Sequence, residues 1–168
     1  AGFVKNYAIK SNIKEEDLIS NNIFLSQIAQ KALEGDNAAV DTIEEATKYL
    51  ALLLYERITT IYKGWQNLFK FNNRNRLPLE KNHKYINEVL NRIVIGQRLA
   101  DLLKSRTGHQ VMMLPLINEL SQHIHNSTCL DEKAKCHYLH GNRFRNELIV
   151  LSTLRDAPAL GAAIDAFL

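Results

Sequence analysis

The chain has 168 residues, 46% of them hydrophobic and 23% charged, and a formal net charge of +3. This length and composition are typical of one globular domain, or of one lobe of a larger protein, and they exclude a low-complexity chain. The charge is too small to indicate a nucleic-acid-binding protein, and no apolar run approaches the roughly 18 residues that a membrane helix needs.

The cellular location and the extent of the chain can also be addressed from the sequence. Only two cysteines are present and no signal-peptide pattern opens the chain, which favours the cytoplasm. The first residue is not methionine, so we expect residues 1–168 to form a single lobe of a longer protein whose other part could hold the chemistry.

The N-terminal part is predicted to be helical. Residues 1–35 carry two short helical patterns, near 15–19 and over 23–33, and Gly35 is placed to end the second. Residues 1–12 carry no firm signal beyond Phe3, Val4, Tyr7 and Ile9, which we expect to dock on a neighbouring element or on another lobe of the protein.

A long central helix is predicted over residues 36–63. Asp36 is a favourable N-cap because its carboxylate can accept hydrogen bonds from the free amides of the first turn, and Gly64 ends the pattern. Apolar residues recur at intervals of three and four and define one buried face: Ala39, Ile43, Ala46, Leu50, Leu54, Ile58 and Ile61. The helix is long enough to serve as the backbone of the lobe.

Residues 64–88 are typical of a loop or an insertion, because asparagines and a proline interrupt the apolar pattern. Basic and aromatic residues alternate there, a composition that can bind phosphates or nucleobases but more often forms a solvated loop. Nucleic acid is therefore not the expected partner. Residues 89–168 are expected to form strand–helix units, with a helix over 112–124 that tolerates Pro115 only in its first turn.

The most informative stretch is 92–103. Residues 93–95 are three β-branched residues, which favour a buried strand, and Gly96 would let the backbone turn or approach a ligand closely. Leucines then recur at helical spacing, which places Gln97 and Arg98 near a helix N-terminus. The same residues also fit one continuous helix over 84–105, and the pattern alone leaves both alternatives open.

Histidines and cysteines gather between residues 123 and 140, at His123, His125, Cys129, Cys136, His137 and His140. The candidate zinc ligands are Cys129, Cys136, His137 and His140, because Cys136 and His140 are four residues apart and could share a helix face. No C-x-x-C spacing accompanies them, so the pattern favours exposed histidines and two half-buried thiols over zinc. No motif of a catalytic nucleophile or of a phosphate-binding loop is present, and no catalytic residue is assigned.

Three stretches of the chain occur in an informative order: residues 34–39 with the long helix after them, the strand and glycine at 93–96, and the small-residue segment 152–163. In this order they resemble the C-terminal lobe of the ROK family (repressor, open reading frame, kinase), within the sugar-kinase, Hsp70 and actin superfamily. The resemblance covers residues 30–168 apart from an insertion near 63–88. It implies an α/β, helix-rich fold with few strands, the C-terminal lobe of an actin-like ATPase (ribonuclease H-like) fold; the alternative is an all-α bundle.

The resemblance also implies a nucleotide site. In the family, the glycine turn after the first strand and the small-residue helix near the C-terminus lie beside the adenosine of ATP. Carried over, Gly96 and Gln97 would approach the ribose or base, and Gly161 and Ala162 would line the lobe nearby. Arg98 would face the nucleotide from the start of the helix. The family usually has a second glycine where this chain has Gln97.

The expected function is that of the adenosine-facing lobe of a ROK-type, sugar-kinase-like ATP-binding protein. We expect the lobe to be inactive in isolation, because the family's catalytic aspartate and sugar-binding segment have no counterpart in this sequence. The intact protein would bind ATP with magnesium and a sugar, and a homodimer is left open. The alternative is a helical regulatory or protein-interaction module without nucleotide chemistry. The first hypothesis predicts parallel neighbouring strands at 93–95 and 148–151, and the second a continuous helix through Gly96.

Overall fold

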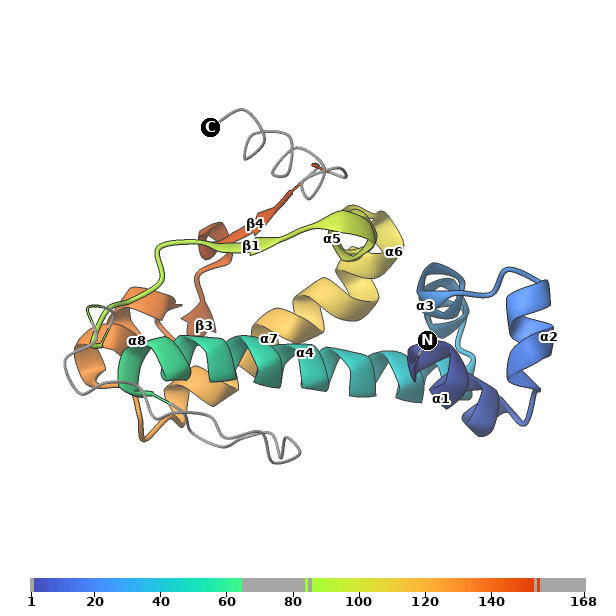
Figure 1. The fold of residues 1–168 in the computed structure, drawn as a ribbon, viewed down its shortest axis with the longest axis horizontal. Coiled ribbons are helices and arrows are strands. Elements are labelled where there is room, and N and C mark those ends of the chain that lie inside the picture. The colour runs from blue at the N-terminus through green and yellow to red at the C-terminus, as the bar shows by residue number, and fades with distance from the viewer. Residues whose placement is uncertain (1, 65–83, 85, 153, 155–168) are drawn as a thin grey trace, which may run out of the picture.

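The computed structural model describes residues 2–64, 84, 86–152 and 154. The described part is helix-rich and carries two small sheets of two strands each (Figure 1). The elements are, in chain order, α1 (Gly2–Ser11), α2 (Glu15–Ser20), α3 (Leu25–Leu33), α4 (Asn37–Lys63), β1 (Ile93–Ile95), α5 (Gln97–Lys104), α6 (Arg106–Gly108), the π-helix η1 (His109–Met113), α7 (Leu114–His125), α8 (Glu132–Tyr138), β2 (Leu139–His140), β3 (Arg143–Phe144), the 3-10 helix η2 (Asn146–Leu148) and β4 (Ile149–Leu151).

The central helix α4 has the predicted bounds. The Asp36 carboxylate accepts a hydrogen bond from the Ala39 amide at 2.9 Å, and Gly64 follows the last residue with a left-handed φ of 89°. The buried surface of α4 is wider than the single apolar face predicted from the sequence, because Thr47 and Tyr55 are also buried. Helices α1, α3 and α7 all pack against α4, so this helix is covered on several sides.

Helix α1 was not predicted. Its side chains Val4, Tyr7 and Ala8 are buried, and the Tyr7 hydroxyl donates a hydrogen bond to the Asp36 carboxylate at 2.9 Å. Three helices rather than two therefore precede α4. The reason is tertiary: α1 is held against the start of α4, while its own sequence carries no cap.

Helix α7 follows α6 and η1 in one helical run. Pro115 is the second residue of α7, in the first turn as predicted. Because proline has no amide hydrogen to donate to the preceding turn, the regular hydrogen bonding is interrupted there, and the π-helical turn η1 comes directly before it. Leu116, Leu120 and Ile124 of α7 are fully buried.

Strands β1 and β4 pair in parallel, with Val94 opposite Val150, and the Ser152 amide extends the pairing by donating to the Ile95 carbonyl at 2.8 Å. The predicted parallel strands are confirmed, except that Leu148 belongs to η2. The continuous helix over 84–105 and the all-α bundle are both wrong. The β-branched run 93–95 meets a partner strand more than fifty residues away in the chain, and this pairing decides against a helix.

The arrangement in space places the paired strands along one side of the molecule and α4 along the other (Figure 1). Helix α7 runs obliquely from the strand side toward α4, and the buried apolar residues from Val4 to Ile149 form one cluster.

The antiparallel hairpin β2–β3, which turns at Gly141, was not predicted. Most of the predicted loop or insertion lies outside the described residues. None of the described helices combines the length and the apolar character needed to cross a bilayer.

Candidate functional site

The connection from β1 to α5, called here the β1–α5 corner (residues 93–101), contains a sharp change of backbone direction. Ile95 ends the strand with its side chain buried, and Gly96 continues in an extended conformation with φ −120° and ψ −178°. Gln97 then adopts a left-handed φ of 58° before the helix proceeds. The expectation that Gly96 makes the turn is therefore wrong: any residue can adopt its φ and ψ, and Gln97 makes the turn.

Helix α5 begins without a side-chain cap. Gly96 occupies the N-cap position, and its carbonyl accepts a hydrogen bond from the Ala100 amide at 3.3 Å. The amides of residues 97–99 in the first turn have no intrahelical acceptor, and the helix dipole adds partial positive charge at the same place. This end of α5 therefore favours a group that accepts hydrogen bonds or carries negative charge.

A cavity of about 700 Å³ lies at the β1–α5 corner. Its described lining consists of Gly96, Gln97, Arg98, Leu99 and Asp101. The structure thus brings together the three residues that the sequence had singled out here, and it adds Leu99 and Asp101. Asp101 could have been found from the sequence, because residues four apart share one face of a helix.

Gly96 leaves the backbone open on this side. A Cβ atom built on Gly96 would meet no atom within 4 Å in the described part of the chain. A ligand in the cavity could therefore approach the main chain directly. The other two predicted site residues, Gly161 and Ala162, lie outside the described residues.

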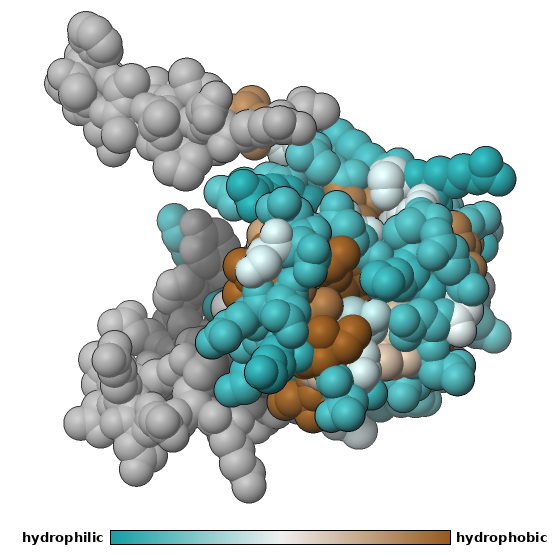
Figure 2. All heavy atoms as spheres, turned by 90° about the vertical axis from the view of Figure 1, so that its right-hand side faces the viewer, coloured by the Kyte–Doolittle hydropathy of each residue, from teal (hydrophilic) through white to brown (hydrophobic). Residues whose placement is uncertain are grey.

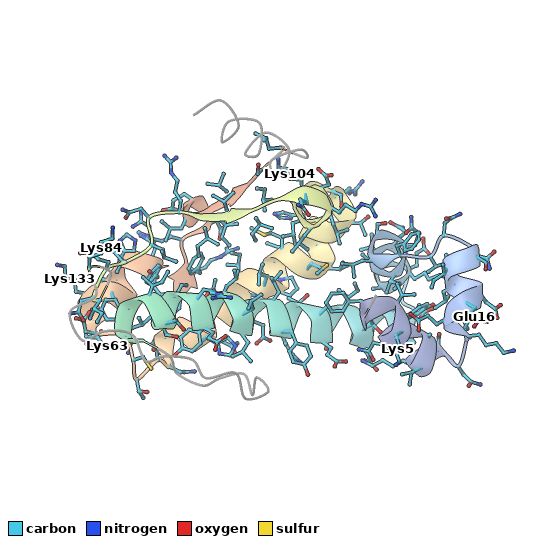
Figure 3. All side chains as sticks on the ribbon, viewed as in Figure 1. Lys5, Glu16, Lys63, Lys84, Lys104 and Lys133 are labelled. Atoms are coloured by element: carbon cyan, nitrogen blue, oxygen red, sulfur yellow. The ribbon has the colours of Figure 1, made fainter. Side chains whose placement is uncertain are left out.

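The charges on α5 are arranged along its length. Arg98 is exposed in the first turn, and no ion pair of its guanidinium is formed within the described segments. Asp101 follows in the next turn, and Lys104 lies at the far end of the helix (Figure 3). The helix carries two cationic side chains and one carboxylate, which favours an anionic ligand near Arg98.

The shifted pKa values that are resolved for described residues belong to groups away from the corner. Burial, together with the hydrogen bond to Asp36, raises the pKa of Tyr7 to about 12. The Ala39 amide and the Tyr7 hydroxyl hold the pKa of Asp36 below its ordinary value. Burial likewise raises the pKa of Tyr138, whose hydroxyl accepts a hydrogen bond from the Leu90 amide. These shifts report how the helices are joined, and they identify no acid or base for catalysis.

The candidate zinc ligands are spread over three different elements. Cys136 and His137 lie in α8, Cys129 lies in the loop before it, and His140 lies in β2. The prediction that Cys136 and His140 share a helix face is wrong, because α8 ends at Tyr138. The His137 ring lies 3.1 Å from the Leu90 carbonyl. Within the described ranges, no three side chains of His, Cys, Asp or Glu are grouped so that they could hold a metal ion.

A second cavity, of about 340 Å³, is lined almost entirely by apolar side chains. Its described lining is Phe3, Leu25, Ala46, Tyr49, Leu50, Leu53, Leu99 and Met112. Leu99, in the first turn of α5, lines both cavities. Figure 2 faces the α1–α3 end of the molecule and shows hydrophobic side chains gathered within a hydrophilic surround. Exposed apolar residues at this end include Ile9 and Ile19.

Comparison of the chain with models of known protein families, with curated protein sequences and with solved structures finds no match.

Proposed function

We propose that this chain is the adenosine-facing C-terminal lobe of a ROK-type, sugar-kinase-like ATP-binding protein with an actin-like fold. The observation that carries the proposal is the cavity at the β1–α5 corner, where Gly96, Gln97 and Arg98 line one space beside a strand end. Its volume lies within the range of small-molecule sites, roughly 300–1,000 Å³.

The topology supports this placement. In open α/β sheets, ligands bind beyond the carboxyl ends of parallel strands, and the ends of β1 and β4 lie together because Ile95 pairs with Leu151. The free amides of α5 and the Arg98 guanidinium could hold an anionic part of a nucleotide, while the open backbone at Gly96 lets a flat ring or a ribose approach. The sequence order of the three ROK-like stretches, one of which ends at this corner, supports the same proposal.

The chemistry of the intact protein follows from the proposed family. A sugar hydroxyl would attack the terminal phosphate of ATP and would lose its proton to an aspartate. No residue of this chain matches that aspartate. Magnesium is usually held by one or two carboxylates together with the phosphates, and Asp101 is the single carboxylate in the described lining. We therefore assign this chain nucleotide binding without turnover, and we assign no magnesium ligand to it.

Nucleotide binding by the full 168-residue chain tests the proposal. ATP and ADP should bind saturably in calorimetry. They should also raise the unfolding temperature, by an amount that grows with the logarithm of one plus the ratio of ligand concentration to Kd. Gly96→Ala and Gly96→Val should fold normally, because the space beside the Gly96 backbone is open and its extended conformation suits any residue. Both should weaken ATP binding, with valine the worse, because the added side chain enters the cavity.

Gly2→Ala is the matched control for these variants, since Gly2 also has open space around it but lies in α1. It should leave ATP binding unchanged. Binding that is absent from the wild-type chain, or that ignores a valine at position 96, would count against the proposal. Sugar-dependent ATP hydrolysis by this chain would show that a catalytic group is present and would contradict the assignment of binding alone.

A protein-interaction module is the second candidate, and the apolar cavity favours it. Phe3 is 40% exposed, Leu53 39% and Tyr49 55%, although all three are large apolar or aromatic side chains lining one cavity. Contiguous exposed apolar surface of this kind often marks a contact with another protein. This candidate predicts that Leu53→Lys abolishes partner binding while ATP and ADP leave the unfolding temperature unchanged.

A further inference from the structure

Helices α1 and α2 carry apolar side chains that the fold leaves uncovered. Ile9 of α1 is 70% exposed, Ile19 of α2 is exposed, and so is Ile13 in the connection between the two helices. Helix α1 contacts α2, so the three isoleucines lie on neighbouring segments at one end of the molecule. Figure 2 faces this end and shows hydrophobic side chains within a hydrophilic surround. Exposed apolar side chains gathered in this way often mark a contact with another molecule.

The core of the fold does not need these isoleucines. Tyr7 and Ala8 of α1 and Leu18 of α2 are the buried neighbours that hold the two helices in place. Neither Ile9 nor Ile19 belongs to the buried cluster. A substitution at either exposed position should therefore leave the fold intact, which makes this surface suitable for testing.

The charges beside the isoleucines have opposite signs on the two helices. Helix α1 has no acidic side chain, and its Lys5 lies one turn before Ile9 on the same face. Helix α2 has no basic side chain, and its Glu16 lies three residues before Ile19. Both charged side chains are exposed at this end of the molecule (Figure 3), and neither forms an ion pair within the described ranges.

The helix dipole accounts for only one of these charges. A carboxylate is stabilised in the first turn of a helix, where Glu16 lies, but a cation such as Lys5 is not stabilised toward the N-terminus of α1. The dipole also gives no reason for the exposed isoleucines. A cationic helix, an acidic helix and apolar side chains between them together require another explanation.

Such a surface complements a second copy of itself. In an isologous contact, a two-fold axis brings each residue i onto residue j of the other copy, while j meets i. An axis through the isoleucines lays α1 of one copy against α2 of the other, so that Lys5 meets the partner's Glu16. A partner of a single charge sign would instead be repelled by one of the two helices.

We propose that the α1–α2 surface, made up of Lys5, Ile9, Ile13, Glu16 and Ile19, joins two copies of this chain in a two-fold dimer. The isoleucines of the two copies bury one another and supply the affinity, because this removes apolar surface from water. The two Lys5–Glu16 pairs at the edge fix the orientation of the copies. The proposal is independent of nucleotide binding, since the α1–α2 surface shares no residue with the β1–α5 corner.

Sedimentation velocity of the full 168-residue chain, at concentrations from about 1 μM to about 1 mM, tests the proposal. The wild-type chain should shift from monomer to dimer. Ile9→Lys places a charge inside the contact and should raise the dissociation constant of the dimer about tenfold or more. Val94→Lys is the matched control, because Val94 is similarly exposed but lies in β1, away from α1 and α2 (Figure 1), and it should leave the dissociation constant unchanged.

Charge exchange tests which residues face each other across the contact. Lys5→Glu and Glu16→Lys should each weaken the dimer, because each places like charges opposite one another twice. An equimolar mixture of the two single variants should form a heterodimer about as stable as the wild-type dimer, and the double variant should dimerise equally well. A pair formed within one chain would be restored by the double variant but not by the mixture.

Circular dichroism of every variant should match the wild type, since each substituted side chain is exposed. A wild-type chain that stays monomeric at the highest concentration would overturn the proposal. A dimer that Ile9→Lys leaves intact would do the same, because its contact would lie elsewhere. A mixture of Lys5→Glu and Glu16→Lys that remains monomeric would overturn the two-fold arrangement.

Discussion

The helical body of this chain, formed by α1–α4 and α7, and the β1–α5 corner differ in how completely their apolar side chains are buried. In the body, Ile58, Leu116 and Leu120 have no exposed surface. In the sheet beside the corner, Val94 is 65% exposed and its cross-strand partner Val150 is 38% exposed. The sheet therefore covers the core with one face only: its inward-facing Ile95 and Ile149 belong to the same buried cluster as the body, while Val94 and Val150 face outward.

Several polar groups follow the same division, although Glu56 Oε1 and Thr60 Oγ1 of α4 are buried without a hydrogen-bond partner among the described residues. In the body, the Tyr55 hydroxyl donates to the Ser127 hydroxyl at 2.8 Å, and Tyr7 is bonded to Asp36. At the corner, Gln97 and Arg98 make no side-chain hydrogen bond to the described residues. Satisfied polar groups fix a structure, whereas unpartnered groups beside a cavity are available to bind a ligand. Substitutions in the body should therefore change the stability of the fold, whereas substitutions at the corner should change the proposed ligand binding.

The largest expected effect comes from truncating a side chain between α4 and α7. Leu120→Ala should lower the free energy of unfolding by about 3 kcal/mol, because it removes buried methyl groups and leaves a cavity. Urea denaturation followed by circular dichroism measures this loss. Val94→Ala is the control in the exposed sheet and should cost far less. Equal losses at the two sites would contradict the division between body and corner.

A smaller effect is expected where α5 joins the body. A Cβ atom on Gly108 would clash with the carbonyl oxygen of Leu102, so Gly108→Ala should reduce the free energy of unfolding by about 2 kcal/mol. In an unobstructed helix the same change stabilises, which Gly2→Ala in α1 should show. Thermal unfolding of both variants checks the sign. A stabilised Gly108→Ala would mean that α5 and α6 do not approach as closely as described.

The smallest of these effects concerns the cap of α4. Asp36→Ala should cost about 1 kcal/mol, because the Ala39 amide and the Tyr7 hydroxyl lose their acceptor. Asp36→Asn keeps an acceptor for the amide and should cost less at neutral pH. Chemical denaturation at a series of pH values measures both changes.

The pH dependence of the wild-type chain gives a further check on the cap. The pKa of Asp36 is lower in the folded chain than its ordinary value of 3.8, so the unfolded chain binds the proton more readily. The stability from the ionised cap is therefore present above about pH 4 and is lost as the pH falls through the lower, folded-state pKa. Asp36→Asn should flatten this part of the acid dependence, and an unchanged profile would exclude Asp36 as its source.

Local chemistry made several elements predictable. The bounds of α4 follow from Asp36 and Gly64, and the position of Pro115 follows from its missing amide hydrogen. Helix α1 was missed because its packing on α2, α3 and α4, rather than a local signal, stabilises it. The hairpin β2–β3 was also missed, although Gly141 and Asn142 form a dipeptide that favours a tight turn. The candidate zinc segment could not be judged from spacing, since the end of α8 at Tyr138 places His140 on a strand.

By itself, the sequence determined where helices begin and end and which short runs prefer a strand, because caps, glycines and β-branched residues act on their immediate neighbours. Only the tertiary structure decided that residues 93–95 form a strand rather than part of a helix, since their partner β4 lies far along the chain. It also decided that Gln97, and not Gly96, carries the left-handed turn, because the pairing of β1 and the packing of α5 together fix the backbone between them.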